Sequence, residues 1–127
     1  MGKYVRVDLD ERLIDFSVAV IILSEKLPNS IAGKHICGQI TRSGTAPALQ
    51  YAEAQAAESP ADFIHKMKVA LKELRETYAA LRIIKKIGWC AGEPLQNLLR
   101  ENNELISIFV TSVKTARKNA GLDGKDE

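Results

Sequence analysis

Seven basic side chains are concentrated between residues 60 and 88 of this 127-residue chain, which makes that segment the first candidate for chemistry. Only three acids share the segment, so its net charge is +4, against +2 for the whole chain. If Ile64 takes position a of a heptad, five of the bases fall at positions e and b and form one stripe along a helix. Such a stripe can neutralise phosphates. The predicted nucleic-acid-binding residues are Lys68, Lys72, Arg75, Arg82 and Lys86.

Two interpretations of this stripe remain open. Long basic side chains often cover the edge of an apolar stripe with their methylene groups and bind nothing. Contact with RNA or DNA is the second interpretation. No aromatic residue interleaves with the five bases at the b and e positions of the stripe, so base stacking is not indicated, and binding would be directed at the backbone with little dependence on base sequence.

Acidic and basic residues between positions 42 and 73 form a second candidate group. We expect them to lie on the second and third helices, as an ion-pair network across that helix pair or between subunits: Arg42, Glu53, Glu58, Lys66 and Glu73. A pair of catalytic carboxylates is the alternative, but nothing in the sequence determines the separation of these side chains. No catalytic residue is predicted, and the protein is not expected to be an enzyme.

Metal-ligating residue types are few in this sequence. His65 follows Asp62 by three residues, which resembles one Glu-x-x-His pair of a di-iron bundle, but such a site needs two pairs and two further glutamates. Cys37 and Cys90 are the only cysteines, and in a chain of this size we expect reduced thiols, with a disulfide between them as the alternative. The sequence therefore predicts no metal site and no cofactor.

Four helices without strands are predicted to carry these residues. The first spans about Asp10 to Lys26 and ends before Pro28, and either Asn29 or Ser30 caps the second. Glycine is a poor helix former, and proline removes a backbone donor and clashes with the preceding turn. The second helix is therefore expected to have a kink or short break near Ser43 to Pro47.

The third and fourth helices have clearer start and stop signals. The segment Ser59-Pro60-Ala61-Asp62 places a cap, a proline and an acid at the start of the third helix, and Gly88 ends it. The fourth helix is expected to begin at Gly92-Glu93-Pro94 and to end near Asn119. Its predicted buried stripe consists of Leu95, Leu98, Asn102, Leu105, Phe109 and Ala116, widened by Leu99, Ile106 and Val113.

Short connections favour antiparallel neighbours, so the expected fold is all-α, an antiparallel up-and-down four-helix bundle. The length suits one domain, residues 1–120, with a disordered tail over residues 121–127. The longest uncharged apolar run, Phe16 to Leu23, is too short to cross a bilayer, and the first residues lack the pattern of a secretory signal. We therefore expect a cytoplasmic protein without membrane contact.

The third helix has more apolar surface than one bundle core needs. Apolar residues at positions g and c widen its core-facing arc, and such a surplus suits an interface between subunits. A broad contact with its own core is the alternative. The predicted oligomer-interface residues are Phe63, Ala80, Ile84 and Ile87.

Three segments resemble a family of small bacterial four-helix bundle proteins first noticed as reading frames inside intervening sequences of 23S ribosomal RNA genes. They are GKHICGQITRSGT (33–45), YAEAQAAES (51–59) and DFIHKMKVALKELRET (62–77). The chain departs from the family at Gln50, where Asn is usual, and at Ala80, where Trp is usual. The resemblance implies a ring-shaped homo-oligomer, usually a pentamer, without assigned enzyme activity.

The same resemblance implies a distant similarity to the accessory proteins of diversity-generating retroelements, which bind nucleic acid and a reverse transcriptase. Together with the basic stripe, it predicts a non-enzymatic, homo-oligomeric scaffold or binding module. The expected partners are further copies of this chain and the backbone of RNA or DNA. An adaptor that binds another protein, without nucleic-acid contact, is the alternative, and the salt dependence of binding distinguishes the two.

Overall fold

The computed structural model describes the backbone of residues 2–122 and the side chains of residues 9–122. Four long helices and no strand make up this part of the chain, so the all-α prediction is confirmed. The helices are α1 (Gly2–Ser24), α2 (Ile31–Gln55), α3 (Pro60–Ile87) and α4 (Glu93–Asn119). The first helix begins earlier than predicted. Within the predicted tail, residues 123–127 lie outside the described residues.

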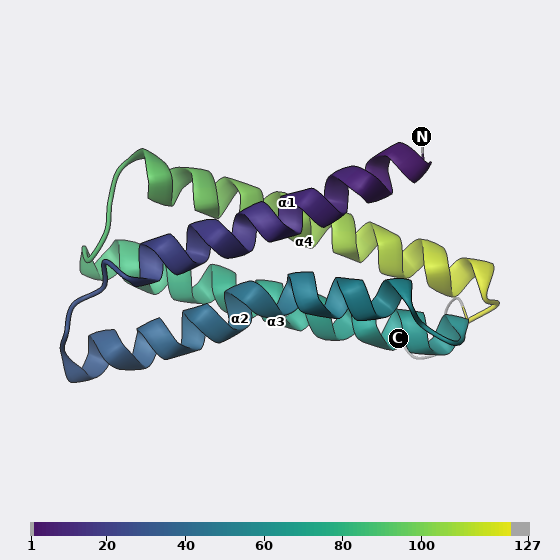
Figure 1. The fold of residues 1–127 in the computed structure, drawn as a ribbon, viewed down its shortest axis with the longest axis horizontal. Coiled ribbons are helices and arrows are strands. Elements are labelled where there is room, and N and C mark those ends of the chain that lie inside the picture. The colour runs from purple at the N-terminus through teal and green to yellow at the C-terminus, as the bar shows by residue number, and fades with distance from the viewer. Residues whose placement is uncertain (1, 123–127) are drawn as a thin grey trace.

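Each helix packs against the next one along the chain, and α4 returns to α1. The loops at residues 25–30, 56–59 and 88–92 are short, so consecutive helices run in opposite directions (Figure 1). Among the described residues, the backbones of α1 and α3, which are diagonal in the bundle, do not come close. Helices α1 and α4 contact each other least, and in Figure 1 they cross and diverge toward their ends.

Local signals determine where most of the helices begin and end. The hydroxyl of Ser30 accepts a hydrogen bond from the Gly33 backbone N–H at 3.0 Å, which makes Ser30 the cap of α2. Ser59 caps α3 in the same way, accepting from the Asp62 N–H at 3.1 Å. Gly88 ends α3 with a φ of 84°, in the left-handed region that glycine adopts without strain.

Helix α2 is continuous through Pro47, so the short break that we allowed for near Ser43 to Pro47 is absent. Proline removes one hydrogen bond within a helix and usually bends it. Figure 1 shows the axis of α2 changing direction about midway along its length. Ser43, Gly44, Pro47 and Ala48 are all buried, so packing against the neighbouring helices offsets the lost hydrogen bond.

The core is a single cluster of aliphatic side chains from all four helices. Within it, the rings of Tyr51 on α2 and Phe109 on α4 meet edge to face, with centroids 6.2 Å apart. The predicted buried stripe of α4 is largely confirmed: five of its six main positions are buried, and Ala116 is partly buried against the core. The core is therefore continuous although the chain has few aromatic residues.

Helices α1 and α2 are in tight contact at Gly44. A β-carbon at this position would lie 2.5 Å from Cγ1 of Val20, which is fully buried on α1. Real side chains do not come that close, so the crossing of the two helices needs a glycine here.

No helix in the described part of the chain combines the length and the apolar character needed to cross a bilayer.

Candidate nucleic-acid interface

The five bases of the predicted stripe lie on the outer surface of α3, and all of them are exposed. Ile64, Met67, Leu74 and Leu81 occupy the opposite side of the helix and are buried in the core. With a rise of about 1.5 Å per residue, the stripe extends over about 27 Å of helix from Lys68 to Lys86. One continuous, capped helix therefore presents five cationic groups along one side.

None of the five stripe residues forms an ion pair with a described side chain. Their charges are therefore not neutralised within the described part of the subunit. Other bases on the same pair of helices differ, because Arg42 and Lys66 both have acidic partners. The cations of the stripe thus remain available to an anionic ligand.

Two groups of ion pairs join α2 to α3. Arg42 donates to Glu73 at 2.8 Å and also to Glu76, and its hydrogen bonds with Glu76 and Glu73 raise the pKa of its guanidinium. Lys66 lies 3.3 Å from Glu53, and this hydrogen bond, with the charge of Asp62, raises the pKa of its ammonium. The structure therefore brings together four of the five residues predicted for the ion-pair network.

Glu58 is the exception in that network. It lies in the loop between α2 and α3 rather than on either helix, so its predicted placement is wrong. Its backbone N–H lies 3.4 Å from Oδ2 of Asp62, and its carboxylate joins no ion pair with a described residue. The reason is local: the cap at Ser59 ends the loop only one residue later.

The predicted oligomer-interface residues on α3 are not a continuous exposed surface. Ala80 and Ile84 are buried within the subunit, so the prediction that they lie beside the core is wrong. Phe63 is partly buried against the core, and only Ile87, at 55% exposure, is open to solvent. Helix α3 packs extensively against both α2 and α4, so its wide apolar arc is used inside the bundle.

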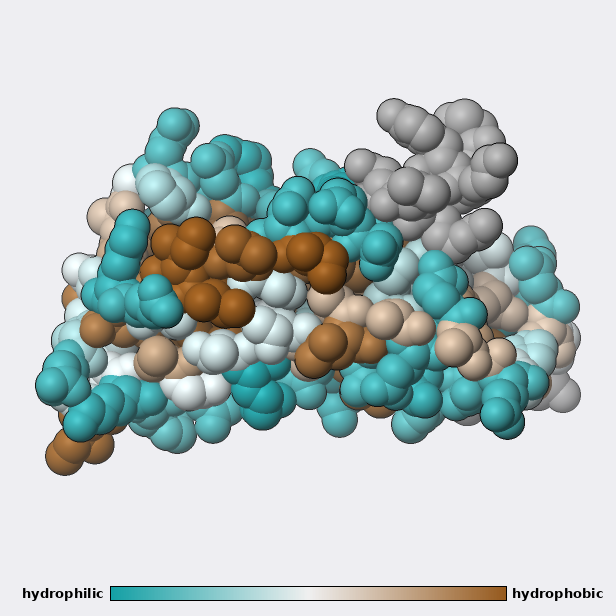
Figure 2. Space-filling view, viewed as in Figure 1, coloured by the Kyte–Doolittle hydropathy of each residue, from teal (hydrophilic) through white to brown (hydrophobic). Residues whose placement is uncertain are grey.

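A group of exposed apolar side chains lies instead on α1, where sequence reasoning did not place an interface. Ile14, Val18, Ile21 and Ile22 are 45%, 50%, 39% and 53% exposed, and their spacing of four, three and one puts them on one side of the helix. We call these four residues the α1 face. Figure 2 shows apolar side chains gathered over the second half of α1. The signal was present in the uncharged run Phe16 to Leu23.

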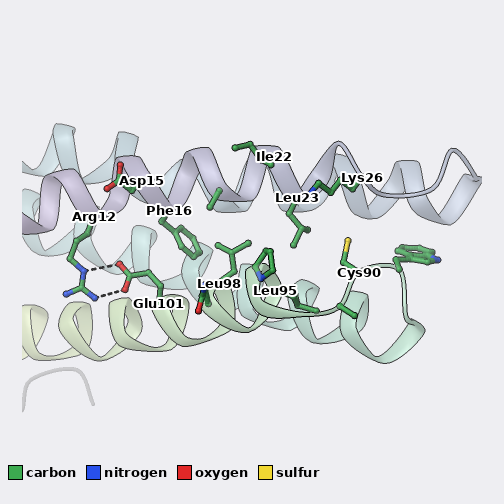
Figure 3. A pocket seen from close by; sticks show the side chains of 15 residues that line it. Arg12, Asp15, Phe16, Ile22, Leu23, Lys26, Cys90, Leu95, Leu98 and Glu101 are labelled. Atoms are coloured by element: carbon green, nitrogen blue, oxygen red, sulfur yellow. Dashed lines mark hydrogen bonds and ion pairs between the residues drawn. The ribbon is translucent and has the colours of Figure 1, made fainter.

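A groove of about 600 Å³ runs between α1 and α4, beside the α1 face. Phe16, Leu23, Leu95 and Leu98 contribute to its apolar lining (Figure 3). At one end, Arg12 forms a two-pronged ion pair with Glu101, with contacts of 2.9 and 2.7 Å. The apolar lining and the volume of the groove suit an apolar ligand or a helix rather than a polar substrate.

Arg12 connects α1 to α4 across the mouth of this groove. Besides Glu101, it donates to Glu104 at 2.8 Å. The hydrogen bond to Glu101 is the main cause that raises the pKa of Arg12 above its ordinary value, so the guanidinium stays charged at any physiological pH. Sequence reasoning missed this pair because its members are about ninety residues apart.

Residue types that bind metals do not converge anywhere in the described part of the chain. His65 is exposed on α3, and the nearby Asp62 carboxylate lies 3.7 Å from the Lys66 ammonium. Cys37 and Cys90 are both free thiols, each partly buried.

Comparison with known proteins identifies a sequence family and solved structures of similar fold. The sequence model of a family described as 23S rRNA-intervening sequence protein matches residues 7–111. The fold is similar to the crystal structure of a protein of unknown function from the S23 ribosomal protein family of Bacteroides thetaiotaomicron. The TM-score is 0.77 with 28% sequence identity, and the match covers 84% of this chain and 98% of the other. No curated protein matches this chain.

Proposed function

This chain belongs to the 23S rRNA-intervening sequence protein family, and from that premise we propose that it is a non-enzymatic, homo-oligomeric scaffold that binds the backbone of RNA or DNA. The stripe of Lys68, Lys72, Arg75, Arg82 and Lys86 on α3 is the binding surface. The observation that carries the proposal is that all five side chains are exposed and that none is paired with a described acid.

The chemistry of the stripe favours backbone contact over recognition of bases. Lysine and arginine side chains release the counterions condensed on phosphates, which makes affinity strongly dependent on salt. No aromatic residue occupies the b and e positions of the stripe, and Tyr78, which falls at position a, is partly buried, so stacking on unpaired bases has no platform within the stripe. We expect single-stranded and double-stranded nucleic acids to bind with little sequence preference.

Repetition of the stripe in an oligomer should raise the affinity for nucleic acid above that of a single subunit. One stripe reaches only a few phosphates, and non-specific binding of this size is weak at physiological salt. Several stripes held in one assembly act at a high effective concentration for the same strand. The exposed α1 face supports assembly, because monomers rarely leave a contiguous apolar patch open to water.

The test compares two charge-reversal variants that change the net charge equally. Replacing Lys72 and Arg75 by Glu removes the centre of the stripe, whereas replacing Lys114 and Lys118 by Glu alters exposed bases near the end of α4. A gel shift with a random-sequence RNA at low salt should show that the first variant weakens binding about tenfold or more, and the second far less.

Two outcomes would contradict the proposal. Equal weakening in both variants would mean that total charge, and not the stripe, attracts the nucleic acid. Absence of binding at low salt would mean that the stripe is only a solvated surface. In the second case, a protein-binding adaptor becomes the better interpretation of the fold.

A further inference from the structure

The basic stripe on α3 consists of two parts that are separated along the helix. The first part ends at Arg75, and the second begins at Arg82. Residues 76–81 include no base, so about 10 Å of helix between the two parts has no cation. The stripe therefore presents two groups of charge, and their surroundings can be compared.

The first part of the stripe has polar neighbours. At helical spacing, Glu73 and Glu76 lie on the side of α3 next to Lys72 and Arg75. Both glutamates accept hydrogen bonds from Arg42 on α2. An ion-paired surface offers no apolar contact, so this part of α3 presents only its cations to a nucleic acid.

The second part of the stripe has apolar neighbours. Ile83 and Ile87 are 49% and 55% exposed and lie one turn apart on α3, and we call them the isoleucine row. Each follows a base of the stripe by one residue, Arg82 and Lys86, and neither base forms an ion pair with a described side chain. The last two turns of α3, near the end of the bundle with the loops at residues 25–30 and 88–92 (Figure 1), therefore combine cations with exposed apolar surface.

An unpaired strand of nucleic acid matches this combination of surfaces. Its phosphates attract lysine and arginine, and the apolar faces of its bases pack against apolar side chains. A duplex hides the same base faces in its stack, so it can use the cations but not the isoleucine row. The second part of the stripe thus offers a single strand more contact than it offers a duplex.

We propose that Arg82, Ile83, Lys86 and Ile87 form a subsite for the unpaired bases of a single strand whose phosphates follow the rest of the stripe. The inference rests on the proposed nucleic-acid function and deepens it by naming the substrate class. Arg82 and Lys86 belong to both the stripe and the subsite, and this continuity favours nucleic acid over an acidic peptide. Packing on base faces is tolerant of base identity, so sequence preference stays small.

An abasic strand separates base contact from backbone contact, because it carries the same phosphates without bases. Fluorescence anisotropy at low salt measures the affinity of the wild-type protein for a labelled oligothymidylate and for a labelled abasic strand of equal length. The oligothymidylate should bind about fivefold more tightly or better. The salt dependence should be the same for both strands, because both contact the same cations through phosphates.

Replacing both isoleucines by serine removes the isoleucine row without changing the charge. The variant with Ile83→Ser and Ile87→Ser should bind the oligothymidylate about as weakly as the wild type binds the abasic strand, while its affinity for the abasic strand stays unchanged. The matched control carries Ile31→Ser and Leu49→Ser, since these residues are 92% and 65% exposed on α2. The control should bind both strands as the wild type does.

The wild-type measurement separates this inference from the proposed function. Equal affinity for the two strands would overturn the subsite and leave binding to the backbone in place. Absence of binding to either strand at low salt would overturn the proposed function together with the subsite.

The variants identify other uses of the isoleucine row. Equal losses in the serine variant and its control would overturn the subsite, because exposed apolar surface anywhere would then suffice. A lower native mass of the serine variant in light scattering would make the row a contact between subunits. An acidic amphipathic peptide that displaces the oligothymidylate at a lower concentration than unlabelled oligothymidylate does would assign the row to a protein partner.

Discussion

Asn102 is the most unusual single residue of the core. It lies at a buried position of α4 between leucines, is fully buried, and neither its amide nitrogen nor its amide oxygen has a hydrogen-bond partner among the described residues. An unsatisfied buried polar group costs about 1–3 kcal/mol of stability. The periodicity of α4 predicted the burial of Asn102 but not its lack of partners.

We therefore expect Asn102→Leu to stabilise the protein. Leucine has the same number of side-chain heavy atoms as asparagine and no polar group to desolvate, so the free energy of unfolding should rise by about 1–3 kcal/mol. Thermal unfolding followed by circular dichroism measures the change. Asn103→Leu is the control, since Asn103 is exposed and its replacement should have little effect. A lower melting temperature for Asn102→Leu would show that the amide has a stabilising role.

A second group of buried polar atoms, unlike Asn102, has its hydrogen bonds. The hydroxyl oxygens of Thr77 and Ser43 lie 2.8 Å apart between α3 and α2, and Thr77 Oγ1 is also 2.8 Å from the carbonyl oxygen of Glu73. Each hydroxyl has one proton, so Thr77 can donate to the carbonyl while Ser43 donates to Thr77. This pair helps to hold the middle of α2, where Pro47 removes a backbone donor, against α3.

At the scale of helices, the crossing of α1 and α2 depends on one glycine among several in the same helix. Gly44 lies against Val20, whereas a β-carbon on Gly38 would meet nothing within 4 Å outside its own helix. The two positions are six residues apart, and no local sequence signal distinguishes them. Only the packing of α1 shows which glycine is needed.

Alanine substitutions at these two glycines should have opposite effects. Gly38→Ala should stabilise the protein by about 0.5–1 kcal/mol, because alanine is the better helix former and the site is open. Gly44→Ala should destabilise it by about 1–3 kcal/mol, because Val20 is buried, stiff and unable to move aside. Urea unfolding of both variants measures the difference. Equal stabilisation would mean that α1 and α2 can separate at little cost.

At the scale of the whole molecule, the diagonal arrangement separates the two proposed surfaces. The α1 face lies on the outer side of α1, and the groove lies between α1 and α4. The basic stripe lies on α3, the helix diagonal to α1. Loss of assembly should therefore leave each stripe intact but reduce the number of stripes that act together.

The predicted consequence is a loss of nucleic-acid affinity in Val18→Glu, which places a charge on the α1 face and should reduce assembly, although its stripe is unchanged. At a salt concentration where the wild-type oligomer binds a long RNA, the variant should bind at least tenfold more weakly, because linked sites gain affinity through effective concentration. Fluorescence anisotropy with a labelled RNA measures this, and a short RNA that reaches one stripe serves as the control. Unchanged affinity for the long RNA in a smaller assembly would contradict the role of multivalency.

Much of this fold could be predicted from the sequence because the interactions that determine it are local. The caps at Ser30 and Ser59, the left-handed stop at Gly88 and the periodic stripe of α4 act within a few residues, so the residues alone determined four helices and, apart from the start of α1, their approximate ends. Short loops then determined the antiparallel order. The stripe on α3 could also be predicted, because residues at helical spacing share a side whatever the helix packs against.

The tertiary structure decided which apolar sides were covered, and there the predictions for α3 and α1 were incomplete. Ala80 and Ile84 are inside because α3 has two close neighbours, whereas Val18 is outside because α1 packs closely with α2 and only loosely with α4. Helical periodicity defines the sides of one helix but carries no information on how many other helices meet it. That number depends on the crossing of helices far apart in the chain, and it determined where the protein keeps its exposed apolar surface.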